Sequence, residues 1–141
     1  MAASIAARAI IAIVVAGVCY GAWKLLGLAV LLRAGRAGNR GAESLKGFVS
    51  GKPGFLIFGS PHCAPCVHAQ KPAAKKLESE LGAAIQLIEV DVTEEPSLAE
   101  RYGVVSLPTV FLFDASGKPR RVNHGCVSAD ELRRQIAPYL A

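Results

Sequence analysis

The 141-residue chain has room for one domain and a short appendage. Its net charge of +5 belongs to residues 1–46, which hold six basic side chains and one acidic one, whereas residues 47–141 hold ten of each. This distribution argues against nucleic-acid binding, because a protein of that kind carries a basic face on its folded domain.

The appendage is an apolar segment, Ala9–Leu32, in which Lys24 is the only charged residue. As a helix it would cover about 36 Å, enough to cross a hydrocarbon core of about 30 Å with some tilt. Lys24 lies past the midpoint, where its long stem can reach the interface, and Tyr20 and Trp23 beside it are typical interfacial anchors. We therefore predict a membrane anchor over residues 1–32, with one transmembrane helix at about residues 9–32.

A cleaved signal peptide is the alternative interpretation of this segment. Only one arginine precedes the apolar run, the run is longer than a usual signal-peptide core, and no A-x-A cleavage site follows it. These features favour a retained anchor. Residues 33–46, which come next, are small, glycine-rich and basic, and they predict a linker.

In the remaining residues, 47–141, strand-like and helix-like segments alternate, which is typical of a βαβ architecture. The predicted strands are residues 54–59, 85–91, 109–113 and 119–124. The predicted helices are residues 66–81, residues 96–102 and a last helix that opens at a capping box over residues 128–131. We interpret the order β-α-β-α-β-β-α as three parallel strands joined by helices, followed by a hairpin and a closing helix.

Two of the predicted helices have an apolar face. In the first, the residues at four-residue spacing are Ala69, Ala73, Leu77 and Leu81, and Gly82 ends the helix. In the last, the residues that should face the sheet are Leu132, Ile136 and Leu140.

The sequence Ser-Pro-His-Cys-Ala-Pro-Cys at residues 60–66 falls where the first strand ends and the first long helix begins. Unpaired N–H groups and the helix dipole stabilise an anion at such a junction, so a thiol there is expected to ionise below the free pKa of about 8.5. Cys63 is then the expected nucleophile, and Cys66, one turn on, the thiol that resolves the mixed disulfide. Pro65 fits the first helical turn, where its missing N–H costs no hydrogen bond.

A metal site is the main alternative for this motif, because a C-x-x-C pair is commonly half of a zinc site and His62 and His68 are close by. A four-ligand structural site usually has a second pair on another hairpin, and only His124 and Cys126 remain for it. The strand–motif–helix context favours redox chemistry.

Three features match the thioredoxin family in order and spacing over residues 47–141. They are the Cys-Ala-Pro-Cys motif, the stretch Tyr-Gly-Val-Val-Ser-Leu-Pro-Thr at residues 102–109, and Gly125 followed by a last helix with Glu131 and Leu132. The chain therefore resembles this family. The resemblance implies an α/β three-layer fold with a central mixed sheet, and protein-disulfide oxidoreductase activity that requires no bound cofactor.

In thioredoxins the proline that matches Pro108 is cis and lies against the redox cysteines. Its neighbour, here Leu107, offers backbone groups that pair with an extended substrate strand. The resemblance thus implies protein thiols and disulfides as partners. The implied substrate-binding residues are His62, Pro65, Leu107, Pro108 and Gly125.

Two departures from the family pattern affect the expected chemistry. His62 stands where thioredoxins have tryptophan; protonated, it would favour the Cys63 thiolate and a more oxidising pair, and a solvated loop histidine is the alternative. The family's buried acid and its lysine partner correspond here to Ile57 and Leu87. We therefore expect Cys66 to have no internal base and to lose its proton to water or His62.

Two further cysteines remain. By the match, Cys126 lies in a loop beside the substrate groove, where it is either an additional redox cysteine or a small apolar filler. Cys19, inside the apolar segment, is expected to be passive.

We expect a monomeric, single-pass protein of the cell membrane that contacts lipid through its N-terminal helix and acts on membrane-associated proteins. Arg33, Arg36 and Arg40 follow the apolar segment and Arg8 precedes it, so the positive-inside rule favours a cytoplasmic domain. Short N-terminal anchors also carry redox domains to the outer face, so the side stays open. A non-catalytic domain that binds peptides in the groove is a further alternative.

Overall fold

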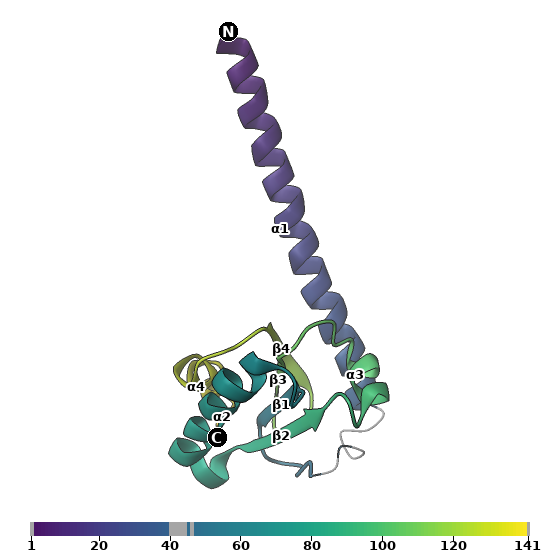
Figure 1. Ribbon diagram of the computed structural model, residues 1–141, viewed down its shortest axis with the longest axis vertical. Helices are drawn as coiled ribbons and strands as arrows, with labels where there is room; N and C mark the ends of the chain where they lie inside the picture. The colour runs from purple at the N-terminus through teal and green to yellow at the C-terminus, as the bar shows by residue number, and fades with distance from the viewer. Residues whose placement is uncertain (1, 40–44, 46, 141) are drawn as a thin grey trace.

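A computed structural model describes residues 2–39, 45 and 47–140 (Figure 1). The four strands are β1 (Gly54–Gly59), β2 (Gln86–Asp91), β3 (Thr109–Phe113) and β4 (Pro119–His124). The helical segments are α1 (Ala2–Asn39), a π-helical turn η2 (Cys66–Gln70), α2 (Lys71–Leu81), α3 (Pro96–Tyr102) and α4 (Ala129–Ile136), with short 3-10 turns at Gly82–Ala84 and Ala137–Tyr139. The predicted strands and helices are all present, and β2 begins one residue later than expected.

The strands form one mixed sheet in the order β2-β1-β3-β4. β1 is parallel to β2, but β3 is antiparallel to both β1 and β4, so the interpretation of three parallel strands is wrong for β3. The seven-residue α3 rises about 10 Å, roughly half the length of a six-residue strand. Because it is too short to return the chain to the far end of the sheet, β3 starts where β1 finishes, with Thr109 opposite Phe58.

Helices cover both faces of the sheet, which gives the three layers that the resemblance implied. α2 and α4 cover one face over a core of side chains that are almost completely buried: Phe55, Ala74, Leu77, Val110, Leu112, Leu132 and Ile136. α3 and the end of α1 cover the other face, where the core includes Val30, Leu56, Phe58, Leu98, Tyr102 and Phe111.

The predicted signals at helix ends are present. Gly82, which ends α2, has φ +50°, and the hydroxyl of Ser128 accepts the N–H of Glu131 at the start of α4. In α4, Leu132 and Ile136 are fully buried as predicted, whereas Leu140 beyond it is half-buried.

The buried face of the first long helix differs from the prediction at its start. Ala69 is exposed, and Gln70 is buried in its place. The side-chain oxygen of Gln70 accepts the N–H of Val127 at 2.8 Å, which satisfies this end of the buried amide, whereas its Nε2 has no partner among the described residues. The apolar pattern alone could not indicate such a bond.

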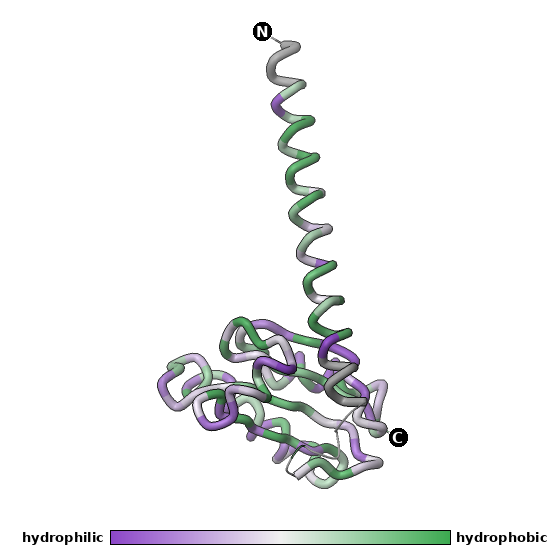
Figure 2. Tube along the Cα trace, turned by 90° about the vertical axis from the view of Figure 1, so that its right-hand side faces the viewer, coloured by the Kyte–Doolittle hydropathy of each residue, from purple (hydrophilic) through white to green (hydrophobic). Residues whose placement is uncertain are grey.

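α1 contains a segment, Ala7–Arg33, that is long and apolar enough to cross a membrane. Figure 2 shows the apolar colour along this helix almost down to the domain. The helix continues to Asn39, so residues 33–39, predicted as linker, are helical. The rest of the predicted linker, residues 40–44 and 46, lies outside the described residues.

The turn between β3 and β4 is organised by one carboxylate. Asp114 accepts hydrogen bonds from the N–H and hydroxyl of Ser116, from the N–H of Lys118, and from the Arg120 guanidinium at 2.6 Å. Burial would raise the pKa of Asp114, but these hydrogen bonds hold it below its usual value of 3.8.

Replacing the carboxylate, Asp114→Asn, should lower the free energy of unfolding by about 1–2 kcal/mol at pH 7, because hydrogen bonds to a charged acceptor are lost. A folded-state pKa below the unfolded one contributes stability that is present above the unfolded pKa and is lost as the pH falls through the folded pKa. The difference between wild type and variant should therefore shrink as the pH falls from 7 to well below 3.8. Urea denaturation of both proteins in detergent micelles, at pH 7 and at the acidic pH, measures this stability difference. A difference that does not change with pH would contradict the lowered pKa of Asp114.

Candidate active site

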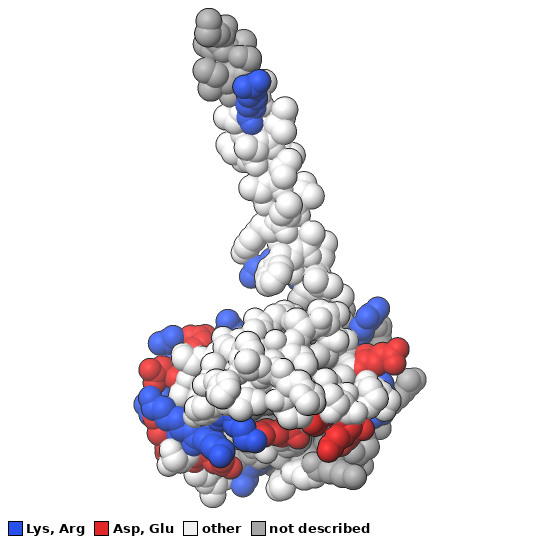
Figure 3. All heavy atoms as spheres, viewed as in Figure 1, with Lys and Arg blue, Asp and Glu red and all other residues white. Residues whose placement is uncertain are grey.

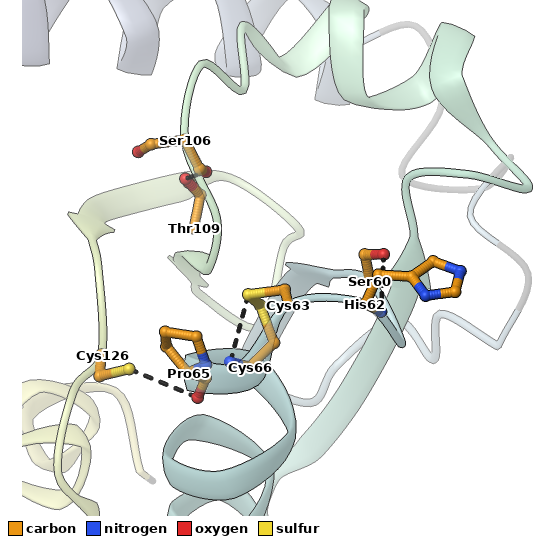
Figure 4. Close-up of a disulfide and its surroundings, with 8 residues drawn as sticks. All are labelled: Ser60, His62, Cys63, Pro65, Cys66, Ser106, Thr109 and Cys126. Atoms are coloured by element: carbon orange, nitrogen blue, oxygen red, sulfur yellow. Dashed lines mark hydrogen bonds between the residues drawn. A yellow bond between two sulfur atoms is a disulfide. The ribbon is translucent and has the colours of Figure 1, made fainter.

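Cys63 and Cys66 form a disulfide at the carboxyl end of β1 (Figure 4). Their Cα atoms are 5.3 Å apart, inside the range that a disulfide bridges. The N–H of Cys63 donates to the carbonyl of Ser60 at 3.1 Å, which closes the turn after the strand, and η2 begins at Cys66. The motif thus occupies the strand-to-helix junction that the sequence predicted.

The two sulfurs have different surroundings. The N–H of Cys66 donates to the sulfur of Cys63 at 3.3 Å, so a helix N-terminal amide points at that atom. Cys66 itself is 8% exposed, whereas Cys63 is half-buried. The more accessible sulfur is therefore also the one that the helix end can stabilise as an anion.

The loop before β3 lies beside the disulfide. The peptide bond between Leu107 and Pro108 is cis, as the resemblance implied. The Thr109 hydroxyl donates to the carbonyl of Ser106 at 2.6 Å, and the Pro108 carbonyl accepts the N–H of Gly125 at 2.8 Å. Within the described residues, neither backbone polar group of Leu107 has a hydrogen-bond partner, so both are available to an extended strand.

The loop after β4 is the third segment at this end of the sheet, beside the redox motif and the loop before β3. Gly125 has φ +89°, a conformation that side chains rarely adopt. The next residue, Cys126, is exposed, and its thiol donates to the carbonyl of Pro65 at 3.5 Å. Figure 4 shows Cys126 beside Pro65 and the redox cysteines, with Ser106 and Thr109 nearby. Leu107 and Pro108 lie between Ser106 and Thr109 in the chain, and Pro108 is hydrogen-bonded to Gly125, so three separate parts of the chain meet at this end of the sheet.

His62 is placed differently from the expectation that it assists Cys63. Its ring points away from the disulfide in Figure 4, although its backbone N–H is tied to the Ser60 hydroxyl at 3.2 Å. The charge of His62 acts instead on Asp91, at the end of β2. The pKa of Asp91 is lowered mainly by the hydrogen bond from the Thr93 hydroxyl and, to a smaller extent, by His62. Among the described residues no cluster of three or more metal-binding side chains is found.

The expectation that Cys66 has no internal base considered only Ile57 and Leu87, and the sheet register brings a different acidic residue next to Ile57. In the parallel pairing of β1 with β2, Ile57 lies opposite Glu89, and Leu87 lies opposite Phe55. Glu89 forms an ion pair with Lys71 at 3.5 Å. Both residues line a cleft of about 530 Å³ that also contains Cys66, so a carboxylate does share an open space with the second cysteine.

Sequence reasoning missed Glu89 because the register of two parallel strands is set by packing rather than by local pattern. A signal was nevertheless present. Ile88 and Val90 alternate with Glu89 and Asp91 along β2, and the apolar pair is buried under α3. This alternation puts the acidic pair on the face that α2 and the redox motif share.

Comparison with known proteins agrees with this geometry. The model of the thioredoxin family matches residues 42–138. Thioredoxin Y of rice chloroplasts (Oryza sativa subsp. japonica) is 33% identical over 91 residues, which are 64% of this chain but 53% of that protein. A thioredoxin-like protein of Synechocystis sp. is 32% identical over 99 residues, covering 70% of this chain and 90% of that one.

Solved structures give the same picture. Thioredoxin-2 of a malaria parasite, described as a component of its protein secretion machinery, superposes with a TM-score of 0.59 at 29% identity, over 62% of this chain and 82% of that one. Chloroplastic thioredoxin z superposes with a TM-score of 0.61 over 72% of this chain and 88% of that one; at 18% identity this likeness concerns the fold alone.

Proposed function

Because the chain belongs to the thioredoxin family, we propose that it is a thiol–disulfide oxidoreductase that exchanges disulfides with protein thiols through Cys63 and Cys66. The observation that carries the proposal is the amide of Cys66 directed at the sulfur of Cys63, at the start of a helix and within bonding reach of a second cysteine. This arrangement favours the thiolate that disulfide exchange requires.

The exchange is a pair of sulfur displacements. The Cys63 thiolate attacks one sulfur of a substrate disulfide, which forms a mixed disulfide and releases the first substrate thiolate. The Cys66 thiolate then attacks the sulfur of Cys63 and releases the second, so that two electrons pass from the dithiol to the substrate. In the opposite direction the same steps oxidise a substrate dithiol. No bound cofactor takes part.

The substrate is proposed to bind as an extended strand along the loop before β3. The backbone N–H and C=O of Leu107 supply the pairing, and Pro108 holds the strand beside the sulfurs. The remaining proposed contacts are with residues around the motif: His62, Pro65 and Gly125. Cys126 is proposed as packing against Pro65 rather than as an electron carrier, since its thiol already donates to that carbonyl.

The second step needs Cys66 to lose a proton, and Cys66 is almost completely buried. We propose Glu89 as the acceptor, through water in the cleft that both residues line. Lys71, paired with Glu89, would keep the carboxylate oriented toward the cleft. About half of the Glu89 side chain is exposed, so the proton can pass on from Glu89 to solvent.

We propose that the apolar segment of α1 anchors the chain in a membrane as a single span, and that residues 47–141 form the redox domain. The proposed substrates are thiols and disulfides of membrane-associated proteins, because tethering raises their effective concentration. The chain is proposed to act as a monomer.

Single cysteine variants test the order of the two steps. Cys66→Ser should accumulate a mixed disulfide with a model protein substrate, since Cys63 can attack but nothing resolves the product. Cys63→Ser should trap nothing and lower exchange to the uncatalysed rate, whereas Cys19→Ser should behave as wild type. Non-reducing electrophoresis and mass spectrometry of the full chain detect the adducts.

Two results would contradict the proposal. Unchanged function in cells with Cys63→Ser would favour a peptide-binding domain. Stoichiometric zinc or copper on the purified chain, without exchange activity, would favour a metal-binding module that uses Cys63, Cys66 and His62.

The role of Glu89 predicts a defect confined to the second step. Glu89→Gln should slow release of product from the mixed disulfide by about tenfold near pH 6, because a positioned base is lost. The difference should diminish as the pH rises, because hydroxide then deprotonates Cys66. Rapid-quench kinetics separates this step, and Glu94→Gln, in the same cleft, is the matched control. Equal slowing in both variants would show a general charge effect instead.

A further inference from the structure

α1 leaves the domain next to the redox site. The Trp23 ring lies 6.4 Å from the ring of His124 at an interplanar angle of 73°. His124 ends β4 opposite Thr109, and the following residue donates its N–H to the Pro108 carbonyl. The anchor therefore emerges at the same end of the sheet as Cys63, and Figure 1 shows the loops before β3 and after β4 at the end from which α1 projects.

The last turns of α1 are docked on the domain. Val30 is 4% exposed and belongs to the same apolar core as Leu98 and Tyr102. A Cβ atom at Gly103 would lie 3.7 Å from Cδ of Arg33, so the helix also reaches the loop after α3. Since α1 is one continuous helix from Ala2 to Asn39, no joint separates the docked turns from the apolar span.

The opposite side of the docked turns is exposed and, apart from Lys24, apolar. Leu25, Leu28 and Leu32 recur at three- and four-residue spacing, and 52–68% of each is exposed. Val105, in the loop that leads to the cis proline, is 75% exposed. In Figure 3 charged side chains lie along the sides and the lower half of the domain, and the area below the exit of α1 is uncharged.

The length of the free helix indicates what covers these side chains. From Arg8 to Trp23 the helix rises about 22 Å, which is less than the hydrocarbon core of about 30 Å. Because the exposed leucines follow Lys24, whose charged end can lie among the headgroups, the bilayer is the occupant that accommodates both the missing length and their exposure.

We infer that the redox end of the domain lies on the bilayer surface, with Val105 and the outer face of the docked turns in the headgroup region. The substrates are then cysteines in segments of membrane proteins that lie close to the bilayer. This inference rests on the proposed function and narrows its substrates to those near the bilayer. It also implies that the docked helix holds the domain at a fixed distance from the membrane, where a flexible tether would let that distance vary.

Depth measurements on the oxidised full chain test the location. A fluorophore is attached at Val105→Cys or, as control, at Ala83→Cys, both with Cys19→Ser and Cys126→Ser. Ala83 is exposed and precedes the start of β2, at the end of the sheet opposite Cys63. In vesicles of phosphatidylcholine and phosphatidylglycerol, lipids with a nitroxide on the headgroup should quench Val105→Cys about twofold or more beyond the control. Equal quenching at the two sites would overturn the inference.

The substrate class has a separate test. A lipid-anchored peptide with its disulfide next to the anchor should exchange at least as fast as one with a long spacer, because the sulfurs sit at the surface. Exchange that requires the long spacer would overturn the inference. If the depth measurement or the peptide assay fails while a soluble disulfide is still reduced through Cys63, the proposed function stands and only the location is wrong. Loss of exchange with every disulfide would refute the proposed function instead.

Discussion

The account depends on one contact, the N–H of Cys66 directed at the sulfur of Cys63. It exists because β1 ends immediately before the motif and the helix begins within the motif. The N–H of Cys66 belongs to the first helical turn, where amides have no carbonyl of the same helix to bond. Packing of Ala74 and Leu77 of α2 against the sheet holds this helix end in place. The chemistry of the chain therefore follows from where a strand stops and a helix begins.

The rest of the site is built around that contact by the topology. The short α3 makes β3 start beside the end of β1, which places Pro108 at the same end of the sheet as the motif. β4 then returns antiparallel, so Gly125 meets Pro108 and the following loop meets Pro65. A parallel third strand would have carried the proline loop to the opposite end of the sheet, away from the sulfurs.

Much of this could be predicted from the sequence. The positions of the strands, the helix caps and the redox motif follow from local patterns, and the resemblance implied the cis bond before Pro108. The direction of β3, the pairing of Ile57 with Glu89 and the burial of Gln70 were missed, because each depends on register or on a partner distant in the chain. The docking of Val30 was missed for the same reason: an apolar run of this length has no local signal for which of its residues face protein.

A redox titration of the full chain tests the central claim most directly. Equilibration in thiol–disulfide buffers, followed by alkylation and mass spectrometry, should show one reversible two-electron couple confined to Cys63 and Cys66, with a midpoint between about −270 and −120 mV. The absence of a reversible couple in that range, or a disulfide that contains Cys126 in place of this pair, would contradict the account.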